Sequence, residues 1–422
     1  MVGSMADSTP VKNYAVPLPP GAPAKLIKIR LSVPEIVGFR GYVRFGEHVQ
    51  ATPYTATTRV VAVSLGGFHK SDDLGASWHR VDVPGFADAR FVNSFTLPDG
   101  LICLQTANTF GYGDVGERRD SGMVVVCRPE GEAVSVFRPT DVNSGARWHG
   151  TSSIDCSNGT LMYAEYPNNA GGRNPDLDAR NPSRVLRSRD SGHSWELVFE
   201  ATGRQVRHFH VLRSDPHQPQ TWWLASGDDA DECRIWRSSD DGDSWQDMTI
   251  KFPDRIQIGD TAFTRHVFRL TDLVFPDERR MIWGTDDVLG AVGAVNPDLP
   301  RSLRGGARVI EAERDAGLVL KEIGYCGQAV RSIVDCGPCW LFITQGLLLR
   351  YTCRATVFAM FKGDYSTCIR LFDVDNYAAA GTAFTASRAS RTARDGVFFT
   401  HRGAKDVFDH PVNVLKWEVS FE

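Results

Sequence analysis

Two histidines spaced two residues apart, His208 and His210, have the side chains and spacing best suited to chemistry in this chain. Residues two apart in a strand lie on the same face, so both imidazoles are expected to project to one side. Such a pair can bind a metal, act as a base and its partner, or hydrogen-bond the backbone. A divalent metal held by His149, His208 and His210 is one expectation, and the other two roles stay open.

Glu165 and Tyr166 form a second group of candidate catalytic residues. A neighbouring carboxylate can increase the nucleophilicity of a phenol oxygen. Adjacent strand residues point to opposite faces, so only a bulge or turn would bring both side chains into one pocket. Hydrogen bonding in the core or a loop is the alternative for each.

Acidic residues follow two apolar strand-like segments. Asp228 and Asp286 stand closest to the ends of those segments. Buried carboxyl groups that lie near one another raise each other's pKa, which suits a general acid. We therefore expect Asp228 to be catalytic and Asp286 to contact substrate, with solvated turns as the alternative.

Two arginines, Arg207 and Arg265, each precede a histidine, and Trp148 precedes His149. A guanidinium group can bind a carboxylate through two parallel hydrogen bonds. We expect Arg207, Arg265 and Trp148 to bind substrate. Salt bridges within the fold are the alternative for the arginines.

The elements that must position these residues are indicated by an eight-residue repeat, S-x-D-x-G-x-S-W, at 71–78, 188–195 and 238–245. Each copy lies between two short apolar segments with strand-like composition. Its Asp can accept hydrogen bonds from turn N–H groups, and its Gly can adopt positive φ. Its Trp can pack between neighbouring sheets. The repeat therefore predicts hairpins, and its acidic residues are assigned a structural role.

These repeats resemble the Asp-box (BNR) repeat of sialidase-like β-propellers, and residues 148–287 resemble a poorly characterised bacterial branch. The resemblance implies an all-β propeller. The second and third copies are one blade apart and the first and second are two apart, which predicts seven blades, with six as the alternative. We expect degenerate copies of the turn at 128–131, at 296–299, near Cys353 and near Gly396.

A single propeller is expected over residues 25–422. Residues 1–24 are expected to form a flexible lead-in, with a tag remnant at 1–4. The segment NVLKWEVSF near the C-terminus can close the ring against the N-terminal segment AKLIKIRL, which would remove exposed sheet edges.

Composition narrows the function classes. The net charge of −4 favours neither nucleic acid nor a membrane as partner. No apolar stretch approaches the roughly 20 residues that span a bilayer. Nine cysteines in irregular spacing fit reduced thiols. The lack of a signal-peptide core predicts a cytoplasmic protein, with secretion as the alternative if a native signal was removed in cloning. The sequence leaves the oligomeric state open.

Three functions fit this pattern. The first is a glycoside hydrolase acting on an acidic sugar at the propeller axis. True sialidases, by resemblance, use a Tyr nucleophile with a Glu base, an Asp acid and three arginines; this chain lacks their FRIP motif. The second is a polysaccharide lyase that removes the proton next to a uronate carboxylate. The third is a propeller that binds glycan or protein without catalysis.

Overall fold

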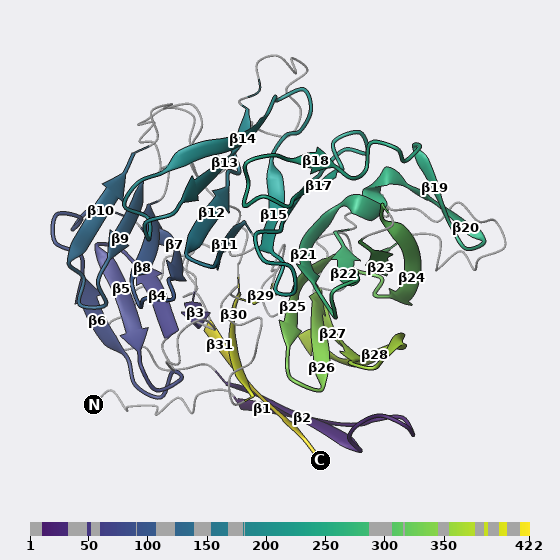
Figure 1. Ribbon diagram of the computed structural model, residues 1–422. Helices are drawn as coiled ribbons and strands as arrows, with labels where there is room; N and C mark the ends of the chain where they lie inside the picture. The colour runs from purple at the N-terminus through teal and green to yellow at the C-terminus, as the bar shows by residue number, and fades with distance from the viewer. Residues whose placement is uncertain are drawn as a thin grey trace, which may run out of the picture.

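The computed structural model describes residues 11–32, 49–51, 60–89, 91–106, 123–138, 153–167, 180, 182–286, 306–314, 317–344, 354–375, 384–386, 396–402 and 414–422. In this part of the chain the strands form seven antiparallel sheets of four or five strands, and Figure 1 shows them side by side around a ring. The predicted all-β propeller with seven blades is confirmed, and the six-blade alternative is wrong. No helix in the described ranges is long and apolar enough to cross a membrane.

Six blades follow one another along the chain, and a two-stranded hairpin lies between the fourth and the fifth. Blade 1 contains β3 (Val49–Ala51), β4 (Val60–Ser64), β5 (Gly67–Ser71) and β6 (His79–Asp82). Blade 2 contains β7 (Phe91–Thr96), β8 (Ile102–Thr106), β9 (Val124–Cys127) and β10 (Ala133–Phe137). Blade 3 contains β11 (Ile154–Ser157), β12 (Thr160–Ala164), β13 (Ser183–Ser188) and β14 (Glu196–Ala201). Blade 4 contains β15 (Phe209–Ser214), β16 (Trp222–Ser226), β17 (Ile235–Ser238) and β18 (Gln246–Asp247). The hairpin is β19 (Arg255–Ile258) and β20 (Thr261–Thr264), followed by the 3-10 helix η3 (Arg265–Phe268). Blade 5 contains β21 (Leu270–Val274), β22 (Arg280–Thr285), β23 (Arg308–Glu313) and β24 (Val319–Tyr325). Blade 6 contains β25 (Val330–Asp335), β26 (Cys339–Thr344), β27 (Arg354–Phe361) and β28 (Asp364–Asp375).

Blade 7 joins the two ends of the chain. It contains β29 (Phe384–Ala386), β30 (Val397–Arg402), β31 (Val414–Phe421), β2 (Leu26–Ser32) and β1 (Val11–Pro17), in that order across the sheet. Strand β2 pairs with β31 from Ile27↔Phe421 to Ser32↔Lys416, and Figure 1 shows the purple and yellow strands together. This is the ring closure that the sequence predicted.

The expected flexible lead-in over residues 1–24 is wrong for its second half. Val11–Pro17 forms the outer strand β1 and pairs with β2 along its whole length. The ring of Tyr14 stacks on Phe372 with centroids 3.8 Å apart, which attaches this strand to blade 6. The prolines in and around this segment favoured a flexible lead-in. An outer strand nevertheless tolerates proline, whereas a central strand does not.

The repeat turns connect the third and fourth strands of blades 1, 3 and 4. In the second copy, Asp190 accepts hydrogen bonds from the backbone N–H of Ser194 at 2.8 Å and from its hydroxyl at 2.6 Å. Gly192 has a φ of 83°, and a Cβ there would lie 2.7 Å from Val126 of blade 2. The glycine is therefore required both by backbone conformation and by the close approach of the preceding blade. These observations confirm the structural role assigned to the repeat.

The tryptophans of the repeat pack each blade against the one before it. Trp78 contacts Phe399 of blade 7, Trp195 contacts Phe137 of blade 2, and Trp245 contacts Phe199 of blade 3, with ring centroids between 5.7 and 6.4 Å apart. Burial of such large aromatic side chains supplies much of the apolar area that holds neighbouring sheets together.

One of the four expected degenerate turns lies where the sequence predicted it. Residues 128–131 do join the third and fourth strands of blade 2. In blades 5 and 6 the corresponding turns instead follow Glu313 and Phe361, and Gly396 leads into the second strand of blade 7. The segment 296–299 and Cys353 lie outside the described residues. These turns lack the S-x-D-x-G pattern, so strand-like composition alone set their expected positions.

His69 of blade 1 predicts a pH dependence of stability. Burial and then the charge of Arg80 lower the pKa of His69 to about 4 from 6.5, with Asp82 partly opposing them. Between these values the unfolded chain binds a proton that the folded chain does not, so stability falls as the pH drops below 6.5. We expect His69→Gln to reduce the slope of unfolding free energy against pH by up to about 1.4 kcal/mol per pH unit between pH 4.5 and 6.

Urea unfolding at several pH values measures this slope. His193→Gln, at an exposed position in a repeat turn, is the matched control and should leave the slope unchanged. A His69→Gln protein with the wild-type slope would contradict the prediction.

Candidate functional site

Polar side chains gather at one face of the ring, where first strands begin and second strands end. These two places lie together in each blade because the first two strands are antiparallel, as in Phe209↔Ser226 and Leu270↔Thr285. We call the cluster formed there by blades 3 to 6 the ring mouth. Its members are Tyr166, Arg207, His208, His210, Asp228, Arg269, Asp286 and Arg331.

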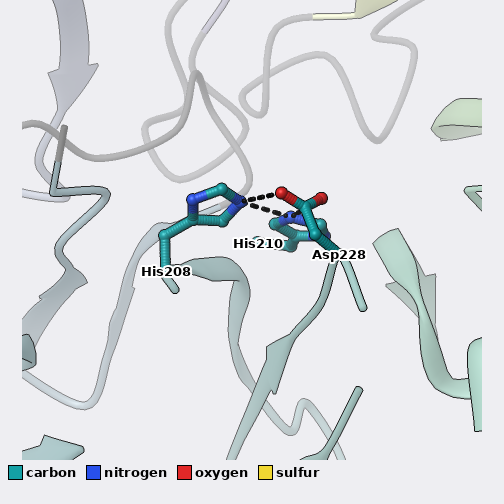
Figure 2. Close-up of side chains that lie close together, drawn as sticks. All are labelled: His208, His210 and Asp228. Atoms are coloured by element: carbon teal, nitrogen blue, oxygen red, sulfur yellow. Dashed lines mark hydrogen bonds and ion pairs between the residues drawn. The ribbon is translucent and has the colours of Figure 1, made fainter. Parts of the chain in front are cut away.

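At the centre of the ring mouth, two imidazoles face one carboxylate (Figure 2). The Nε2 atoms of His208 and His210 are 3.0 Å apart. Asp228 Oδ2 lies 3.3 Å from His208 Nε2, and its Oδ1 lies 3.7 Å from His210 Nε2. His208 and His210 stand around the start of β15, and Asp228 follows the end of β16, so one blade supplies all three.

Three arginines surround the two carboxylates of the ring mouth. Arg207 Nη1 lies 2.6 Å from Asp228 Oδ2, and Arg269 Nη2 lies 2.9 Å from Asp228 Oδ1. Arg269 Nε also contacts Asp286 Oδ2 at 3.3 Å, and Arg331 Nη1 reaches the same oxygen at 3.1 Å. The chain Arg207–Asp228–Arg269–Asp286–Arg331 therefore links blades 4, 5 and 6.

Both imidazoles are held neutral at neutral pH. Burial lowers the pKa of His208, although Asp228 opposes this effect. Burial and the charge of His208 lower the pKa of His210 to about 3. A neutral imidazole keeps a lone pair that can bind a metal, whereas the low pKa of His210 makes that group a weak proton acceptor.

The pKa values of the two carboxyl groups are lowered, whereas the sequence analysis expected them to be raised. Burial alone would raise the pKa of Asp228, but the hydrogen bond from His208 and the nearby positive charges hold it well below its usual range. Burial likewise opposes ionisation of Asp286, but the charges of Arg331 and Arg269 lower its pKa. The expectation that crowded acids raise each other's pKa fails here because the hydrogen bond from His208 to Asp228 and the arginine charges beside Asp286 outweigh it. A role for Asp228 as a carboxylic acid donor does not fit this geometry.

Glu165 and Tyr166 lie in different environments, as their adjacency in a strand predicted. The Tyr166 ring stacks on His208 with centroids 3.8 Å apart, so Tyr166 belongs to the ring mouth. The Glu165 side chain is buried, and after burial its charge is the next cause of the raised pKa of Tyr163. Tyr163 lies in the core between blades 2 and 3, which places Glu165 beside that core.

Arg265 lies in η3 and is buried against backbone rather than in the ring mouth. Its Nη1 donates to the carbonyl of Phe252 at 2.6 Å. Among the described residues no ion pair joins it to Asp228 or Asp286. The remaining sequence candidates, Trp148 and His149, lie outside the described residues.

Sequence reasoning missed Arg269 and Arg331. Both stand at the start of a blade's first strand, the position that His208 and His210 occupy in blade 4. Alignment of the blade starts could have found them, but this requires strand boundaries that the repeat marks only in three blades. Arg265 lies four residues before Arg269, and only its position before a histidine made it a candidate for substrate binding.

No protein-family model matches the chain, and no curated protein matches it either. The solved structures give the fold only. Virginiamycin B lyase from Staphylococcus aureus is similar with a TM-score of 0.53 and 8% identity, over 93% of this chain and 99% of that one. YCF48 from Cyanidioschyzon merolae has a TM-score of 0.49 and 9% identity, over 92% of this chain and 99% of that one. Hydrazine synthase from Kuenenia stuttgartiensis has a TM-score of 0.48 and 13% identity, over 90% and 98% of the two chains.

Proposed function

We propose that the ring mouth binds a polysaccharide through the carboxylate of an acidic sugar. It then cleaves the glycosidic bond beside that sugar by elimination. The observation that carries this proposal is the arrangement of side chains in the site. Two buried imidazoles, one of them stacked on the Tyr166 phenol, lie beside three arginines that pair with Asp228 and Asp286. The site therefore places candidate bases beside several cations.

Elimination needs these two kinds of group. A base removes the proton on the carbon next to the uronate carboxylate, and the negative charge that develops spreads onto that carboxylate. The C–O bond to the leaving sugar then breaks as a C=C bond forms, and the leaving oxygen takes up a proton. Arg207, Arg269 and Arg331 are partly exposed, at 12%, 15% and 19% of their side chains, and can stabilise the developing charge. The stacked Tyr166 and His208 supply the base.

Hydrolysis, which the sequence favoured, receives less support from this geometry. A glycoside hydrolase of the usual type needs one carboxyl group that is protonated near neutral pH. The pKa values of both Asp228 and Asp286 are lowered, for Asp228 chiefly by the hydrogen bond from His208 and for Asp286 by the charges of Arg331 and Arg269. The three hairpin repeats still support kinship with Asp-box propellers as part of this proposal, since that kinship concerns the blades rather than the chemistry.

The experiment is incubation of the protein with a panel of uronate-containing oligosaccharides. Elimination leaves a C=C bond conjugated to the carboxylate, so the product absorbs in the ultraviolet and the substrate does not. We expect absorbance to rise with wild-type protein and to remain flat with Tyr166→Phe. Saturable binding of the same sugars without new absorbance would contradict the proposal and favour a non-catalytic binding propeller.

A further inference from the structure

Three potential metal ligands of the ring mouth converge on one point. One donor atom from each of His208, His210 and Asp228 lies within 4.8 Å of the others. Their side chains are 5%, 3% and 18% exposed, so the point is sheltered but can be reached. Figure 2 shows both imidazole edges directed toward the carboxylate.

Two of the three separations match the edges of a coordination polyhedron, and the third, 3.7 Å between His210 Nε2 and Asp228 Oδ1, is longer. Ligands at about 2.1 Å from a metal lie about 3.0 Å apart at neighbouring octahedral positions and about 3.4 Å apart at tetrahedral ones. The Nε2 atoms are 3.0 Å apart, and His208 Nε2 is 3.3 Å from the nearer carboxylate oxygen. Small movements of these side chains would therefore admit a metal.

Neighbouring residues fix the ligands in place. Arg207 Nη1 and Arg269 Nη2 contact the two oxygens of Asp228 at 2.6 and 2.9 Å. Gly227 lets the backbone pass close to His210, since a Cβ there would lie 3.1 Å from His210 Cε1 and 3.0 Å from Arg269 Cγ. Such outer contacts orient ligands and set their affinity for metals.

The charge of the site indicates what else would bind. Three arginines and the carboxylates of Asp228, Asp229 and Asp286 balance one another, and the imidazoles are neutral. A divalent ion would leave the cluster positive by two charges. An anionic group from a ligand would restore the balance, and a carboxylate suits both a metal and the arginines.

We propose that His208 Nε2, His210 Nε2 and Asp228 bind one divalent transition-metal ion of the zinc class, whose open positions face the ring mouth and take a carboxylate ligand. This inference rests on the proposed function for its ligand and refines it, because imidazoles that hold a metal leave Tyr166 as the base. It also adds Asp228 to the expected ligands His208 and His210, while His149 lies outside the described residues.

The test uses full-length protein treated with a chelator and dialysed. Zn²⁺ is titrated by calorimetry, and Co²⁺ is followed by its visible absorption as a spectroscopic substitute. We expect one ion per chain and a Co²⁺ spectrum of a site with nitrogen and oxygen ligands. His210→Ala and Asp228→Asn should each weaken Zn²⁺ binding by at least about 100-fold, since each removes a first ligand. His193→Ala, at an exposed turn, should bind as wild type.

Each result decides the matter. Absence of uptake by folded wild-type protein, or equal uptake by His210→Ala and wild type, overturns the proposal and leaves the imidazoles as a hydrogen-bonded pair. Thermal melting of each variant establishes that it is folded, and Asp228→Asn keeps the shape of the side chain if His210→Ala does not fold. Stoichiometric Zn²⁺ binding without cleavage of any sugar supports the metal site. It contradicts only the proposed elimination reaction. Full elimination activity by metal-free protein removes the metal's part in the reaction only.

Discussion

Asp215→Asn is expected to lower the free energy of unfolding by about 3 to 5 kcal/mol, the cost of leaving one member of a buried ion pair without its partner. Asp215 of blade 4 pairs with Arg314 of blade 5, and both side chains are fully buried. Asp215 also accepts hydrogen bonds from the backbone N–H groups of His217 at 3.0 Å and Gln218 at 3.2 Å. Asparagine keeps an acceptor for those groups, but it removes the charge and places an amide NH2 where the second oxygen now accepts from Arg314 and from Trp223 Nε1.

Urea unfolding measures the loss, and two further variants separate its causes. Asp215→Ala removes the acceptor as well, so it should cost about 1 kcal/mol more for each backbone hydrogen bond lost. Glu422→Ala breaks an ion pair with Lys28 in which both side chains are about half exposed, and should cost about 1 kcal/mol or less. Asp215→Asn within about 1 kcal/mol of wild type would show that the buried pair contributes little to the junction of blades 4 and 5.

Arg207→Met is expected to reduce kcat/KM for uronate cleavage by about 100- to 1,000-fold, the usual loss when one charge-stabilising donor is removed. Arg207 contacts Asp228 at 2.6 Å and keeps part of its guanidinium exposed at the ring mouth. Arg207→Lys should fall between wild type and Met, because an ammonium keeps the charge but loses the planar pair of donors.

Arg234→Met is the matched control in the same blade. Arg234 pairs with Asp247 of the outer strand β18 at 2.9 Å, and 28% of its side chain is exposed, against 12% for Arg207. We expect its kcat/KM to remain within about twofold of wild type, since it touches no group of the ring mouth. Equal activity of Arg207→Met and Arg234→Met would exclude Arg207 from substrate binding.

The fold was readable from the sequence because its signals are local. The repeat copies at 71–78, 188–195 and 238–245 each set one hairpin, and their spacing counts the blades without knowledge of long-range contacts. The pairing of β2 with β31 followed from the need to remove sheet edges. Strand β1 was missed because an outer strand has weak apolar alternation and borders several prolines.

The site could be predicted only in part from the sequence, because its residues come from four blades. His208, His210 and Asp228 were predicted since they lie within one blade, close to strand ends that the composition marks. Arg269 and Arg331 come from later blades whose starts carry no motif. The pKa of Asp228 was predicted to shift in the wrong direction, because it depends on the hydrogen bond from His208 and on charges that the fold brings beside it, such as Arg269 of the next blade.

The mass balance of the products from a uronate oligosaccharide tests the central claim most directly. Mass spectrometry measures the two fragments of each cleaved molecule in the same sample. Elimination predicts fragments whose masses sum to that of the substrate, with the unsaturated fragment lost when Tyr166→Phe replaces wild type. Fragments whose masses sum to substrate plus one water would contradict elimination, and would return the hydrolase interpretation to first place.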